Sequence, residues 1–244
     1  MRRLFNVPAL LSVSLILLSG ARALAAPKDD VQAALQKLED AKNYSWTTTT
    51  TGGFGANSDG KTEKDGYTVE SMTMRNNTVQ LAKKGDQAVA QTDDGWKTAA
   101  ELAADENAPR GLANALGNIR TPADQAKTIV DAIPAFTVDQ DKAYAADLPT
   151  DTVKQQLTFR RRGNAPAPDI TDPKGTVRVW IDDSGNISKL ELHVTGTVSY
   201  NGNDRDIDRT TTTEIKDIGT TTVDVPADAK TKLDAPTTAP TTQP

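Results

Sequence analysis

VRVWIDDSGNISKLELHVTGTVSY, residues 177–200, alternates between apolar and polar side chains and decides how this chain folds. The apolar or small positions of its second half are Leu190, Leu192, Val194, Gly196, Val198 and Tyr200, and the positions between them are polar. Neighbouring residues of a strand point to opposite faces, so this alternation is typical of a strand with one buried face. We therefore predict an antiparallel sheet that is buried on one side.

A hairpin is predicted to follow this strand. Asn201-Gly202 is a strong turn signal, and the next residues, DRDIDRTTTTEIKDI (204–218), alternate as well. A two-residue loop would pair His193 with Thr210, whereas a four-residue loop would pair Leu190 with Ile215. Both registers keep the same residues on the same faces, so the sequence leaves the register open.

The single histidine, His193, lies on the polar face of the predicted strand with threonines beside it. A catalytic or metal-binding histidine needs a carboxylate or a nucleophile held against it, so we interpret His193 as part of the sheet wall. Asp204, Asp206 and Asp208 lack the glycine and the glutamate that a calcium loop requires after them. We expect a protein that is not an enzyme and has no metal or cofactor.

The N-terminus has the features of a secretory signal. Two arginines follow Met1, an apolar run covers residues 10–18, and Ala23 and Ala25 satisfy the small-x-small cleavage rule. Residues 1–25 are therefore predicted to be a signal peptide. The mature chain should be exported, periplasmic or secreted, soluble, and without a membrane segment.

Composition excludes several classes of protein. The chain has 28 basic and 33 acidic residues, a net charge of −5, and it becomes more acidic when the signal arginines are removed. An acidic chain repels polyanions, so we expect no nucleic-acid partner. The absence of cysteine excludes disulfides, thiolate sites and a lipid anchor on an N-terminal cysteine.

The first part of the mature chain is predicted to contain a helix over residues 29–42, a strand over 43–51 and a long mobile loop over 52–61, GGFGANSDGK. Residues 65–102 indicate an antiparallel meander. Its strands are separated by three turn signals, at residues 75–77, 84–86 and 93–95.

The second part begins with helical signals. Thr121 and Pro122 are typical of a helix start, so a helix is predicted over 121–133, after a shorter one near 111–116. Residues 135–148 alternate, and 148–162 indicate a short helix ending in Arg160, Arg161 and Arg162, either solvated or in contact with an anionic head group. A Pro-rich loop (163–175) precedes the last strands. One domain should cover residues 26–234, and residues 235–244 should form a disordered Thr/Pro-rich tail.

The order of these elements resembles the LolA/LppX-like lipoprotein and lipid carriers of bacterial envelopes. The resemblance covers nearly the whole mature chain and rests on four stretches: NYSWTTTT (43–50), GDQAVAQTDDGWKTAAEL (85–102), VRVWIDDSGNISKLEL (177–192) and TTTTEIKDIGTTTVDVP (210–226). It implies an α+β fold, a half-open antiparallel barrel with helices packed on its concave face. It also implies an apolar cleft that accepts the acyl chains of a lipid or an acylated protein, and no catalytic residues.

Two functions stay open. The first is a non-enzymatic carrier that binds a hydrophobic ligand between sheet and helices. The second is an envelope module that uses the same fold to bind a protein partner or to regulate one, without lipid cargo. Aromatic residues make up only 5% of the chain, which is few for the lining of a lipid site.

Aromatic and methionine side chains on the early strands are the candidates for the border of a cleft. Methionine offers adaptable apolar contacts, and the glycines of the 52–61 loop would permit opening. The predicted border residues are Tyr44, Trp46, Met72, Met74 and Trp96, with Phe54 on the loop as a flap. The alternative is that these residues are ordinary core, as apolar residues at strand spacing usually are.

Overall fold

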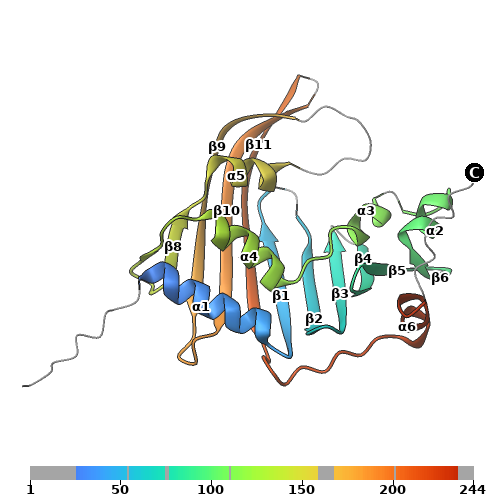
Figure 1. Cartoon of the computed structure of the whole chain (residues 1–244). Helices are drawn as coiled ribbons and strands as arrows, with labels where there is room; N and C mark the ends of the chain where they lie inside the picture. Colours follow the sequence, from blue (N-terminus) through green and yellow to red (C-terminus); the bar gives the residue numbers. More distant parts are fainter. Residues whose placement is uncertain are drawn as a thin grey trace, which may run out of the picture.

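The computed structural model describes residues 26–53, 55–74, 77–109, 111–158, 168–200 and 202–235. Their strands form a single sheet in the order β6-β5-β4-β3-β2-β1-β11-β10-β9-β8-β7, and every neighbouring pair is antiparallel. The sheet is curved and does not close, and α1, α4 and α5 cover one face of β9, β10 and β11 (Figure 1). The α+β class and the half-open antiparallel barrel are confirmed.

The three long strands at the centre are β9 (Asp169–Ile181), β10 (Ile187–Tyr200) and β11 (Asn203–Lys216). His193 lies opposite Thr210, so the hairpin has the register of the two-residue loop. Val194 is fully buried, and Leu190 is buried on the same face. The alternation predicted for this strand is therefore confirmed, and its apolar face points to the helices.

Three helices pack on that apolar face. They are α1 (Pro27–Asp40), α4 (Pro122–Ala132) and α5 (Thr150–Leu157), close to the predicted ranges. Thr121 caps α4 and exchanges hydrogen bonds with Asp124, which satisfies donors at the helix start. Val31 of α1, Val130 of α4 and Val177 of β9 are fully buried in one core cluster, so helices and sheet are in direct contact.

The remaining strands extend the sheet on both sides. β1 (Asn43–Thr51) pairs with β11 and so joins the first part of the chain to the last. The predicted meander is present, and the turns at residues 85–86 and 93–94 fall where they were predicted, whereas residues 75 and 76 of the third predicted turn lie outside the described residues. Its strands are β3 (Tyr67–Met74), β4 (Asn77–Lys84), β5 (Gln87–Thr92) and β6 (Gly95–Thr98), and the opposite edge is formed by β8 (Tyr144–Asp147) and β7 (Thr137–Val138).

The predicted mobile loop over residues 52–61 is wrong in its second half, because β2 (Asn57–Glu63) occupies it. β2 pairs with β1 on one side and β3 on the other. Gly60 lies opposite Trp46, and a Cβ atom on Gly60 would come within 2.0 Å of the indole ring. The glycine that indicates a loop in sequence therefore makes room for a tryptophan.

The predicted Pro-rich loop over residues 163–175 is also wrong in its second half, because β9 begins at Asp169. The pairing of β9 with β10 shifts register between Thr195 and Thr197, beside Pro173. A bulge of this kind is one of the few places where a sheet accommodates proline, which lacks a backbone N–H.

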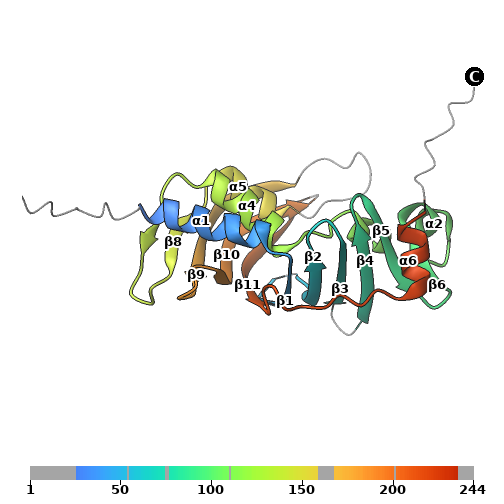
Figure 2. The ribbon, with the colours of Figure 1, turned by 60° about the horizontal axis from the view of Figure 1, so that its bottom comes forward.

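Two short helices were not predicted. They are α2 (Ala99–Ala104) and α6 (Ala227–Leu233), while α3 (Leu112–Leu116) agrees with the expected helix near 111–116. Leu233 of α6 packs with Val89 and Trp96, whereas Ala90 belongs to the cluster under α3. Because Val89 and Ala90 are consecutive in a strand, α6 and α3 cover opposite faces of the sheet. Figure 2 shows α6 beside β4 and β6 at the far end from α1.

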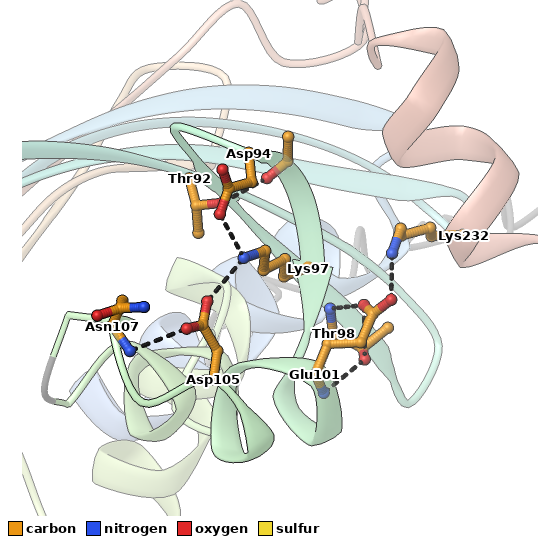
Figure 3. A network of polar contacts seen from close by, with 9 residues as sticks. Thr92, Asp94, Lys97, Thr98, Glu101, Asp105, Asn107 and Lys232 are labelled. Carbon is orange, nitrogen blue, oxygen red and sulfur yellow. Dashed lines mark hydrogen bonds and ion pairs between the residues drawn. The ribbon is translucent and has the colours of Figure 1, made fainter.

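A network of charged side chains ties α2 and α6 to β6 (Figure 3). Lys97 contacts Asp94 at 2.8 Å and Asp105 at 2.7 Å, and Lys232 of α6 pairs with Glu101 of α2. Glu101 also accepts a hydrogen bond from the backbone N–H of Thr98 at 2.7 Å. These contacts, led by the one from Lys232, lower the pKa of Glu101 to about 2.

Several predicted features lie outside the described residues: the signal peptide 1–25, Phe54, the arginines 160–162 and the tail from residue 236. Within the described ranges, no helix is long and apolar enough to cross a membrane.

Gly60→Ala should destabilise the fold by about 1 to 3 kcal/mol, because the added methyl group would have to displace the Trp46 ring or the backbone. Urea unfolding at neutral pH would measure the loss. Lys61→Ala is the matched control, since Lys61 is the next residue of β2 and is exposed. It should change the free energy of unfolding by less than about 0.5 kcal/mol. Equal stability of the two variants would contradict the close contact.

Glu101→Gln should lower stability at pH 7 and have no effect in strong acid. A carboxyl group whose pKa is lower in the folded state stabilises the fold above its unfolded pKa, and this contribution is lost as the pH falls through the folded value. The difference from the wild-type protein should therefore shrink between about pH 4.5 and pH 2. Glu101 is mostly exposed, so the effect at pH 7 should be below about 1 kcal/mol.

Urea unfolding at a series of pH values would follow this difference. Glu106→Gln, which removes an exposed carboxylate from the turn after α2, controls for the loss of one charge. A difference between Glu101→Gln and the wild-type protein that stays constant down to pH 2 would contradict the ion pair.

Candidate binding site

Tyr44 and Trp46 lie together in the main core. Each is 3% exposed, and their ring centroids are 5.9 Å apart. The Tyr44 hydroxyl accepts a hydrogen bond from the backbone N–H of Ala123 at 3.3 Å, and burial raises the pKa of Tyr44. Tyr44 therefore attaches the first turn of α4 to the sheet.

Two other predicted border residues, Met72 and Trp96, pack in clusters apart from this pair. Met72 lies on the same face as Trp46 but packs against the cluster under α3. Trp96 lies on the opposite face, against α6. Met74 ends β3, and its side chain is outside the described part of the structure, as is Phe54. The structure thus brings Tyr44 and Trp46 together, keeps Met72 on their face and separates Trp96 from them.

A hollow of about 730 Å³ lies beside Trp96, between β6, α2 and α6. Apart from Asp228, its charged residues are those of the network in Figure 3, where Lys97 and Lys232 each pair with carboxylates. No group of three or more histidine or acidic side chains in the described ranges could hold a metal ion. We interpret this hollow as the space around the ion pairs that hold α2 and α6 to β6.

A second pocket, of about 410 Å³, opens between the helices and the sheet. Its walls come from one face of α4, the C-terminal end of α5, the linker before α4, and the strands β10 and β11. The lining residues are Asn118 and Arg120 of the linker, Gln125, Thr128 and Ile129 of α4, Gln155, Gln156 and Thr158 at the end of α5, Leu192 of β10 and Arg209 of β11. This pocket lies between sheet and helices, but none of the predicted border residues lines it.

Arg209 is the distinctive residue of this pocket. It is 8% exposed, and its Nη2 donates a hydrogen bond to the backbone oxygen of Gln156 at 2.7 Å. Burial lowers the pKa of its guanidinium. Arg209 is not among the predicted site residues. Its position was readable from the sequence, however, because it lies between Ile207 and Thr211 on the inward face of an alternating strand.

His193 has a partner that the sequence analysis did not predict. Its Nε2 lies 2.9 Å from Oδ1 of Asp208. Asp208 is opposite Thr195, so it is a diagonal neighbour of His193, close enough for two long side chains to meet. The expectation that only threonines surround His193 is therefore wrong. Asp208 is largely exposed and His193 is partly exposed, and solvent weakens such a pair.

The solved structures that are similar to this chain include two mycobacterial proteins. The Mycobacterium tuberculosis lipoprotein LppX gives a TM-score of 0.45 at 11% identity and covers 81% of this chain and 97% of its own. LprF from Mycobacterium bovis gives a TM-score of 0.41 at 9% identity, covering 83% and 97%. No family model matches the chain, and no curated protein matches it by sequence. LppX belongs to the family that the sequence resembles.

Proposed function

We propose that this protein is a non-enzymatic carrier that binds an amphipathic molecule, a lipid or an acylated protein, between its sheet and its helices. The observation that supports this most is the pocket bounded by α4, α5, β10 and β11. Its size is within the range of ligand pockets, about 300 to 1,000 Å³. We also propose that the mature protein acts outside the cytoplasm, periplasmic or secreted, as the N-terminal sequence indicates.

The inner side of the pocket is apolar. Ile129 and Leu192 line it and at the same time belong to the main core cluster. An acyl chain that enters past these two side chains would meet the apolar surfaces of α4 and β10. The core beneath the helices is filled, so a long chain requires α4 and α5 to move away from the sheet.

Such a movement would uncover the part of the sheet face that carries Tyr44 and Trp46, and Met72 continues the same face under α3. We keep these three residues as candidate contacts for the distal part of a long chain. Trp96 would not contact the same chain, because it faces α6.

The alternative, an envelope module that binds a protein partner, receives less support from the surface. Val138, at the edge of the sheet, is the only large hydrophobic residue exposed within the described ranges. An apolar docking surface usually needs a contiguous patch rather than one side chain.

Filling the pocket should weaken binding. Thr128 lines the pocket and is exposed, so Thr128→Trp should place an indole in the cavity and weaken the binding of a neutral amphiphile such as dodecanol about tenfold or more. Isothermal titration calorimetry would measure this. Lys127→Trp is the matched control, because Lys127 is the preceding residue of α4 and does not line the pocket. It should bind as the wild-type protein does.

Native mass spectrometry of the protein purified from its own envelope would give an independent result. A co-purifying lipid that is absent from Thr128→Trp supports the carrier. A clean mass, together with no binding of any amphiphile to the wild-type protein, would reject the carrier and favour the protein-partner module.

A further inference from the structure

The pocket between α4, α5 and the sheet is rich in hydrogen-bond donors. Six of its ten lining residues carry side-chain N–H groups, and none of the ten carries a carboxylate. The six are Asn118, Arg120, Gln125, Gln155, Gln156 and Arg209. The chain as a whole has more acidic than basic residues. A pocket lined by two arginines and no acidic residue therefore indicates a preference for a negatively charged ligand.

The two arginines occupy different parts of the pocket. Arg209 is buried on β11 and held by the backbone oxygen of Gln156, whereas Arg120 is exposed in the linker before α4. The linker is fixed to α4 in turn, because Gln125 Nε2 donates to the backbone oxygen of Arg120 at 3.1 Å. The guanidinium group matches carboxylate and phosphate geometry, and its charge-assisted hydrogen bonds are among the strong ones.

We infer that this pocket binds an anionic group, a carboxylate or a phosphate, through Arg209 and Arg120. The inference rests on the proposed carrier function in one respect: it assigns the anion to the head of the amphipathic ligand. The apolar part of the ligand then lies toward Ile129 and Leu192. The same chemistry could also come from free phosphate, so the experiment separates the two sources.

Four probes distinguish these cases: dodecyl phosphate, dodecanoate, dodecanol and inorganic phosphate, each titrated by calorimetry into the mature protein. Dodecyl phosphate and dodecanoate should bind about tenfold or more tightly than dodecanol, the ratio expected for one good charge-assisted contact. Inorganic phosphate should bind weakly and compete with dodecyl phosphate.

Arg120→Gln and Arg209→Gln should each reduce the preference for the anionic probes severalfold while dodecanol binding stays within twofold. Arg205→Gln is the matched control, because Arg205 lies on the same strand as Arg209 but is exposed and outside the pocket lining. It should retain the full preference. Circular dichroism would show whether Arg209→Gln folds, and the exposed Arg120 supplies the test if it does not.

Each outcome bears on one of the two proposals. Equal binding of dodecanol and the anionic probes by the wild-type protein overturns the anion site and leaves the carrier intact. A preference that survives in Arg120→Gln, and also in a folded Arg209→Gln, overturns the assignment to these arginines. Binding of inorganic phosphate but of no amphiphile rejects the carrier and retains a site for a free anion. Binding of no probe rejects both.

Discussion

The fold depends on holding the apolar face of β10 against the helices. Leu190, Leu192 and Val194 alternate with charged or polar residues, and a slip of one residue would place His193 and its polar neighbours against α1 and α4. The tight turn at Gly202, whose φ of 75° suits glycine, sets this register. Because β11 then pairs with β1, the position of β10 also determines where the N-terminal meander joins the sheet.

The features that were predicted correctly from the sequence are those set by local patterns. The alternation of β10 and β11, the cap at Thr121 and the turns of the meander depend on residues close together in the chain. β2 could not be found in this way, because Gly60 is explained only by Trp46 on the neighbouring strand. The same holds for α6. Its Leu233 is buried only because Val89 and Trp96, which are distant in sequence, form a surface on which the helix packs. The Thr98–Glu101 capping box of α2 was readable and was overlooked.

The candidate site could be predicted only in part. Strand alternation places Trp46 and Met72 on defined faces of their own strands. To relate the face of Trp46 to that of Trp96, however, one must follow the pairing from β1 through β2 to β6, and the sequence analysis treated β2 as a loop. Which helix covers which stretch of the sheet was not encoded in any single segment. Arg209 was accessible from sequence alone, as an arginine at an inward position of a half-buried strand.

The acidic composition and the proposed anion site are compatible because they act over different distances. The net charge of −5 produces a field over the whole surface that opposes polyanions, and physiological salt screens it over about 8 Å. Among the residues that line the pocket, Arg209 and Arg120 are the charged ones, and no lining carboxylate opposes them. A single head group in the pocket is therefore attracted by the arginines more strongly than it is repelled by the distant acidic residues. A nucleic acid must lie across the acidic surface, so repulsion dominates for it. The burial of Arg209 strengthens this selectivity, because a contact between opposite charges is stronger away from water than in it.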